Sequence, residues 1–94
     1  MTIGDICEFK TKFEDADFWL IRKGSESVVG KPTKEYSPEH IGVKVLERDI
    51  LDPTYLYYVF MAFQQTGKFI PLAQGTLRLK HISISSIKNI QLGT

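Results

Sequence analysis

The segment DPTYLYYVFMAFQQTG, from Asp52 to Gly67, carries the signals of a helix at both of its ends. The Asp52 carboxylate can accept a hydrogen bond from the free amides of a first turn, and the fixed φ angle of Pro53 suits the first helical position. Gly67 can adopt the left-handed conformation that commonly ends a helix. We therefore predict one main helix over about residues 53–66.

After Asp52 this segment contains no charged residue, which is unusual for a helix at a protein surface. A helical wheel assigns one wide apolar face to the core: Tyr55, Leu56, Val59, Phe60 and Phe63. The opposite face is amphipathic but uncharged, and exposed apolar patches usually mark contacts. It can meet a loop of the same chain, a second copy or another protein. Its predicted contact residues are Tyr57, Tyr58, Met61 and Gln65.

Short strands are predicted before the helix. Residues 41–47 alternate between apolar and polar side chains, as expected of a strand with one buried face. Shorter strand-like segments occur at about residues 6–9 and 18–22, and the segment SVVGK, residues 27–31, is predicted to pair back as a hairpin.

After the helix, residues 76–80 alternate, which predicts a strand with Leu77 and Leu79 inward and the two intervening basic residues outward. Ser83 is predicted to cap a short helical turn over residues 84–87, and a last strand is expected around residues 90–92. The order of elements predicts an α+β fold, with a small mixed sheet, one main helix and short helical turns.

With 94 residues, the chain is expected to form a single domain over residues 1–94. The single cysteine, Cys7, excludes an internal disulfide and any metal site built from several cysteines. It fits a small buried residue in a reducing compartment, so we expect a cytoplasmic protein. The first residues, MTIGDICEFK, lack the apolar run of a signal peptide, and the predicted helix is shorter than the ~20 apolar residues needed to cross a membrane.

Charge is distributed unevenly along the chain. Residues 1–52 contain eight Lys or Arg and eleven Asp or Glu, a net charge of −3, whereas residues 53–94 contain four Lys or Arg and no acid, a net charge of +4. A basic second half mildly favours a polyanionic partner.

No catalytic or metal-binding motif is evident. The segment GSESVVGKPT, residues 24–33, has five residues between its glycines and a proline after the lysine, so it does not match a phosphate-binding loop. His40 and His81 lie far apart without a second ligand at metal spacing, and the serines at 83, 85 and 86 lack a nucleophile elbow. We therefore expect a protein that is not an enzyme and needs no cofactor.

The residues from Ile50 onward resemble the target-recognition domain of the specificity subunits of type I restriction-modification systems. The resemblance is carried by Pro53, Tyr55, Leu56 and Tyr58 in the helix, by Gly75 with Thr76, and by the segment from His81 to Ile90. The segment IGDICEF near the start is also similar to the first residues of that family. The likeness covers residues 3–9 and 50–92, about half of the chain.

The resemblance implies a non-catalytic module that binds duplex DNA, with a methyltransferase-type subunit or a second copy as possible protein partners. The chain departs from the family in lacking the long helices that join two such domains, and it is much shorter than a usual recognition domain, mainly between residues 10 and 48. A short stand-alone copy of this kind would suit a phage or a mobile element.

Basic side chains can neutralise phosphates, and arginine can also contact base edges. The candidate DNA-binding residues, expected on one broad face, are Arg22, Lys23, Lys31, Lys34, Arg78 and Lys80. The alternative function is a protein-interaction module, a regulator or decoy of restriction-modification machinery that acts through the uncharged, tyrosine-rich helix.

Overall fold

The computed structural model describes residues 1–76 and 78–91, and its strands form two antiparallel sheets. The order of the larger sheet is β1 (Cys7–Lys10), β5 (Ile41–Val45), β2 (Phe18–Leu20) and β4 (Pro32–Thr33). The order of the smaller sheet is β3 (Lys23–Gly24), β7 (Lys80–His81) and β6 (Gln74–Gly75).

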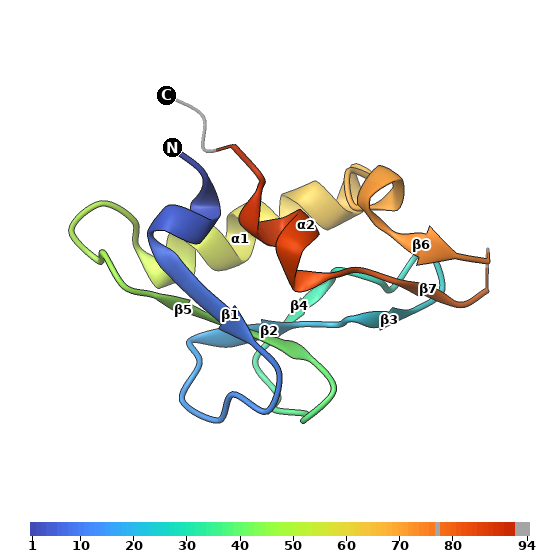
Figure 1. Ribbon diagram of the computed structural model, residues 1–94, viewed down its shortest axis with the longest axis horizontal. Coiled ribbons are helices and arrows are strands. Elements are labelled where there is room, and N and C mark those ends of the chain that lie inside the picture. Colours follow the sequence, from blue (N-terminus) through green and yellow to red (C-terminus); the bar gives the residue numbers. More distant parts are fainter. Residues whose placement is uncertain (77, 92–94) are drawn as a thin grey trace.

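Four helical elements accompany the sheets in the described part of the chain: η1 (Ile3–Asp5), α1 (Pro53–Gln65), η2 (Ile70–Leu72) and α2 (Ile84–Lys88). In Figure 1, α1 lies along one side of the strands, and the β6–β7 hairpin stands at the far end of the molecule. The predicted α+β class with one main helix is confirmed. The strands form two antiparallel sheets rather than one mixed sheet.

The predicted caps of the main helix are present. The Asp52 carboxylate accepts a hydrogen bond of 2.8 Å from the Thr54 amide, and Pro53 occupies the first turn. The helix ends at Gln65, one residue earlier than predicted, and Gly67 follows with a positive φ of 74°. Ser83 likewise caps α2, accepting a hydrogen bond of 3.2 Å from the Ser86 amide.

Replacing Asp52 with alanine should lower the free energy of unfolding by about 1 kcal/mol, because an amide of the first turn loses its acceptor. Chemical denaturation of Asp52→Ala beside Asp49→Ala measures the effect. Asp49 is an exposed carboxylate in the preceding turn, so its removal deletes the same charge without deleting the cap. Equal stabilities of the two variants would contradict the capping role.

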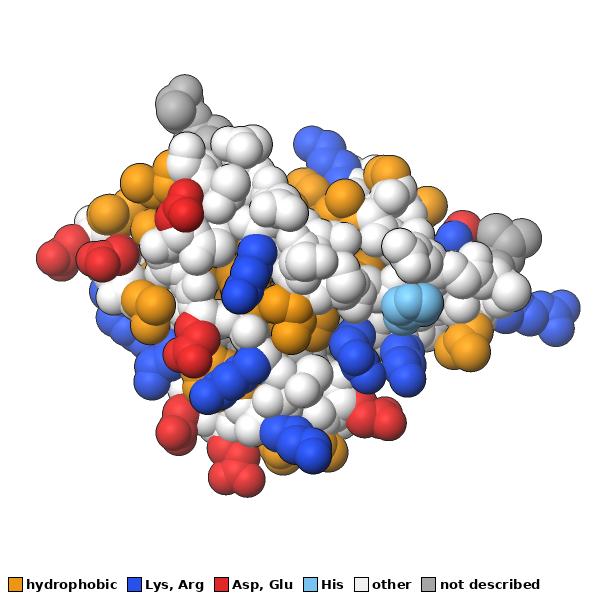
Figure 2. Space-filling view, in the orientation of Figure 1, with side chains coloured by type: hydrophobic (Ala, Val, Ile, Leu, Met, Phe, Trp, Pro, Cys, Tyr) orange, Lys and Arg blue, Asp and Glu red, His pale blue; other side chains and the backbone are white. Residues whose placement is uncertain are grey.

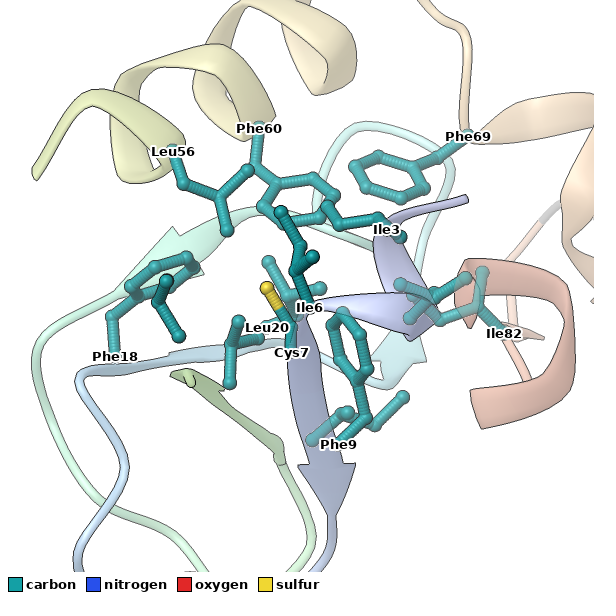
Figure 3. Close-up of a cluster of buried hydrophobic side chains, with 14 of the residues drawn as sticks. Ile3, Ile6, Cys7, Phe9, Phe18, Leu20, Leu56, Phe60, Phe69 and Ile82 are labelled. Carbon is teal, nitrogen blue, oxygen red and sulfur yellow. The ribbon is translucent and has the colours of Figure 1, made fainter. Parts of the chain in front are cut away.

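The core lies between α1 and the larger sheet. Figure 3 shows Leu56 and Phe60 of the helix pointing toward Phe18 and Leu20 of β2. All four side chains are at most 2% exposed. The same cluster also contains buried residues from η1, β1, α2 and connecting segments: Ile3, Ile6, Cys7, Phe9, Phe69, Ile82 and Ile87.

The predicted rotation of α1 is partly wrong. Leu56 and Phe60 are buried as expected, but Tyr55 is 64% exposed and Val59 is 38% exposed. Tyr57, assigned to the outer face, is instead half-buried and packs edge-on against the Phe18 ring, with centroids 5.4 Å apart. The sequence of α1 has apolar residues around the whole helix and no charged stripe, so it does not show which side of the helix is buried.

The other strand predictions have mixed outcomes. The hairpin predicted for residues 27–31 is shifted along the chain: residues 26–30 form the turn, and residues 31–33 return beside β2, with Trp19 opposite Thr33. The predicted strand over 76–80 is wrong for most of its described residues: Thr76, Arg78 and Leu79 lie between β6 and β7 outside both strands, Leu79 is 62% exposed, and only Lys80 lies in a strand, β7. The last predicted strand is reduced to one bridge between Thr2 and Gln91. The assignments of Leu77 and Leu92 lie outside the described residues.

Candidate nucleic-acid interface

The smaller sheet aligns three exposed polar side chains across its strands. Lys23 of β3 pairs with His81 of β7, and His81 pairs with Gln74 of β6. Directly opposed residues of antiparallel strands point to the same side of a sheet, so the three side chains form one row. All three are exposed. We call this side the outer face of the smaller sheet.

The opposite side of this sheet faces the rest of the protein, and we call it the inner side. There the register aligns Gly24, Lys80 and Gly75. The Lys80 side chain is only 13% exposed, and its ammonium lies 3.8 Å from a carboxylate oxygen of Glu26. Lys80 and Lys23 therefore face opposite ways, and the expectation that all six basic candidates share one face is wrong for Lys80. In the sequence Lys80 alternates with Leu79, which predicted a strand with the lysine facing outward. Leu79 instead lies between β6 and β7, outside both strands.

The hairpin turn presents Arg78. The Thr76 amide donates to the Leu79 carbonyl oxygen at 3.1 Å, and the Leu79 amide donates to the Thr76 hydroxyl at 3.2 Å. Gly75 has a φ of 116°, and a side chain there would overlap the Leu79 carbonyl oxygen. These contacts hold Gly75 and Thr76 close to Leu79, and the exposed Arg78 lies between β6 and β7 at the end of their hairpin.

Lys31 and Arg22 are two further basic candidates close to the smaller sheet, and only Lys31 is exposed. Lys31, which directly precedes β4, is exposed, whereas its neighbour Pro32 is buried. Its carbonyl oxygen accepts a hydrogen bond from the Ile21 amide, two residues before Lys23. Arg22 alternates with Lys23 and is half-buried on the inner side, where its Nε has no hydrogen-bond partner among the described residues.

Lys34 lies elsewhere. Its ammonium sits 4.7 Å from the centroid of the Tyr57 ring, beside α1. The structure thus brings Lys23, Lys31 and Arg78 toward the outer face and separates Arg22, Lys34 and Lys80 from them. Figure 2 shows basic side chains beside a histidine over β3 and β7. His81 and Gln74, which the sequence did not single out, complete this face.

The predicted contact residues of α1 are also divided. Tyr58 is 62% exposed and Gln65 is exposed, whereas Tyr57 and Met61 are half-buried and do not belong to the outer surface. The exposed stripe of α1 instead runs through Tyr55, Tyr58, Val59, Ala62, Gln65 and Thr66. It remains free of charge, as the sequence indicated.

An open depression of about 420 Å³ lies between the turn after β3 and the end of α1. Its lining residues, four of which have polar side chains, are Glu26, Ser27, Gln64, Gln65, Gly67 and Ile70. The Gln64 amide donates a hydrogen bond of 2.8 Å to the Ser27 carbonyl oxygen, and Glu26 pairs with Lys80. The Gln64 hydrogen bond thus holds the loop to α1, and the Glu26 ion pair holds it to β7.

Within residues 1–76 and 78–91, no three His, Cys, Asp or Glu side chains cluster as metal ligands would. Burial raises the pKa of the Cys7 thiol to about 11, and the negative charge of the nearby Asp17 carboxylate is a smaller cause of the same shift. This buried thiol therefore stays protonated at neutral pH. The three serines near α2 hydrogen-bond one another and cap that helix. None of the described helices has the length and apolar character needed to span a bilayer.

Comparison with known proteins adds no relative: no protein-family model, curated protein or solved structure matches the chain.

Proposed function

We propose that this protein is a non-catalytic, cytoplasmic DNA-binding module, comparable to one target-recognition domain of a type I restriction specificity subunit. The observation that carries the proposal is the exposed row of Lys23, His81 and Gln74, extended at the hairpin tip by Arg78. No acidic residue occurs in the three strands of the smaller sheet.

The chemistry of this face suits a nucleic-acid duplex. Lys23, Lys31 and Arg78 can bind phosphate oxygens, which supply sequence-independent affinity. Gln74 and His81 offer hydrogen-bond donors and acceptors that base edges can use. A two-stranded β ribbon fits the major groove, which is about 12 Å wide. The β6–β7 hairpin is such a ribbon, and its turn would enter first.

The salt dependence of duplex binding tests this assignment. Three phosphate contacts predict a log–log slope of about −2.7 for the association constant against salt concentration, because each neutralised phosphate releases counterions. The double variant Lys23→Ala with Arg78→Ala should flatten that slope by about 1.8. Fluorescence anisotropy with a labelled duplex measures both values.

Two controls separate the outer face from general charge. Lys68→Ala with Lys88→Ala removes two exposed positive charges elsewhere on the chain and should leave the slope nearly unchanged. Lys80→Ala should also have little effect, because this side chain pairs with Glu26 on the inner side. Equal flattening by all variants would indicate unspecific attraction, and a wild-type protein that binds no duplex at low salt would refute the function.

A second candidate function is a protein-interaction module, a regulator or decoy of restriction-modification machinery of a phage or mobile element. Its support is the exposed, uncharged stripe of α1 with Tyr55 and Tyr58. A purified methyltransferase-type subunit that binds wild-type protein but not Tyr58→Lys, together with the absence of duplex binding, would favour this function over the first.

A further inference from the structure

The exposed stripe of α1 is an uncharged surface, and one of its rings, Tyr58, packs edge-on against the neighbouring Tyr57 ring with centroids 5.3 Å apart. Its residues follow the i, i+3, i+4, i+7 spacing of one helix face: Tyr55, Tyr58, Val59, Ala62, Gln65 and Thr66. Tyr55 and Tyr58 are 64% and 62% exposed, although Leu56 and Phe60 on the opposite side already anchor the helix. The fold therefore does not need these tyrosines for its own core.

The absence of charge on α1 favours contact with a second copy of the same chain. In a two-fold contact the same patch meets itself, so any charge near the axis would approach an identical charge. Pro53–Gln65 contains no Asp, Glu, Lys or Arg. The six side chains of the stripe offer no charged group to a nucleic acid or an acidic peptide, and the nearby Lys34 ammonium lies over the Tyr57 ring, outside the stripe.

The sizes of the side chains select an antiparallel arrangement. Bulky Tyr55 and Tyr58 occupy the first half of the stripe, and small Ala62 and Thr66 occupy the second half. Antiparallel pairing centred near position 60 places Tyr58 of each copy over Ala62 of the other. A parallel pair would stack tyrosines on tyrosines at one end and leave a gap at the other, whereas close helix packing needs large side chains to meet small ones.

Hydrogen bonding and helix dipoles agree with this arrangement. The same register places Tyr55 near Gln65 of the other copy, so the phenol hydroxyl and the side-chain amide can pair. Gln64 is already committed to the Ser27 carbonyl oxygen, whereas Gln65 has no such bond among the described residues. Antiparallel helices also bring ends of opposite partial charge together.

We propose that the protein forms a two-fold dimer in which the exposed stripes of two α1 helices pack antiparallel, with Tyr58 of each copy against Ala62 of the other. The proposal is independent of DNA binding, because the outer face of the smaller sheet contributes nothing to it. The stripe belongs to a single 13-residue helix, so the contact is small and we expect a weak dimer that dissociates on dilution.

Sedimentation equilibrium of the wild-type protein over the micromolar to millimolar range should show a monomer–dimer equilibrium. Tyr58→Lys should weaken dimerisation by about 10-fold or more, because it replaces an aromatic contact with a charge near the axis. Ala62→Glu should have a comparable effect. Both positions are exposed, so circular dichroism should show both variants folded.

Mixing the two variants tests the register. In a mixed dimer, the antiparallel arrangement places the new lysine against the new glutamate and leaves the second Tyr58–Ala62 contact intact. The mixture should therefore dimerise more tightly than either variant alone. Tyr55→Lys and Gln65→Glu are a second pair of single variants that face each other in the same register. Mixing them replaces the first test if the variant at position 58 or 62 fails to fold.

Several results would overturn the proposal. A wild-type protein that stays monomeric at millimolar concentration excludes self-association and leaves a different protein as the occupant of the stripe. A dimer unaffected by Tyr58→Lys uses another surface. Two pairs of folded variants that show no recovery on mixing would exclude the antiparallel register.

Discussion

Replacing Phe60 with alanine should lower the free energy of unfolding by about 3–5 kcal/mol. Phe60 is 2% exposed, and its ring is stacked on Phe69 with centroids 5.9 Å apart. It also meets the Phe18 ring of β2 at 6.1 Å. Its truncation would leave a cavity where α1, the larger sheet and the segment after α1 converge. Urea denaturation of the monomer measures the loss.

The adjacent Val59 is the matched control. A helical wheel groups Val59 with Phe60, but Val59 is 38% exposed. Val59→Ala should therefore cost less than about 1 kcal/mol, as expected for a surface position outside the core. Similar losses for the two variants would contradict the rotation of α1, and a near-zero loss for Phe60→Ala would contradict the core itself.

Replacing Gly30 with alanine should cost about 2–4 kcal/mol. Gly30 has a φ of 84°, a region that L residues with side chains rarely adopt. A Cβ at this position would also lie 2.6 Å from Cγ of Phe69. The Phe69 ring cannot move away freely, because it packs against Phe60 and Phe63. Backbone strain and overpacking thus act together.

Gly67→Ala separates these two causes. Gly67 has a similar φ of 74°, but a Cβ there would meet only Cδ1 of Ile70 at an ordinary 3.5 Å. We expect it to cost about 1–2 kcal/mol, the backbone contribution alone. Thermal or urea denaturation of both variants measures the difference. If Gly30→Ala is no more destabilising than Gly67→Ala, the close packing of Gly30 against Phe69 is wrong.

Local signals in the sequence were sufficient for the regular elements. Asp52 with Pro53 predicted the start of α1, and Ser83 predicted the cap of α2, because a cap depends on residues within one turn. The alternation in residues 41–47 predicted β5 for the same reason: burial of one sheet face leaves a period of two in the sequence.

The side of α1 that turns inward could not be predicted as reliably. A charged stripe normally marks the solvent side of a helix, and this helix has none. Its rotation is fixed by tertiary contacts instead, including the edge-on packing of Tyr57 against Phe18. Those two residues are far apart in the sequence, so a helical wheel cannot contain this information.

The candidate interface was only partly predictable for the same reason. Lys23 and Arg78 were identified by their charge, but the row that contains Lys23, His81 and Gln74 depends on pairing between distant segments. The strands involved are two residues long, too short to show a period of two. Lys80 was assigned to the wrong side because a tight turn and a short strand can share the same alternating pattern.

The most direct test of the central claim is a nuclear magnetic resonance titration of the labelled protein with a short DNA duplex at low salt. Binding by the outer face of the smaller sheet predicts that the amide signals of Lys23, Gln74, Arg78 and His81 shift most and shift back as salt is raised. Signals of Tyr55 and Tyr58 should stay in place. No shift at the four outer-face amides, or shifts confined to α1, would contradict the account.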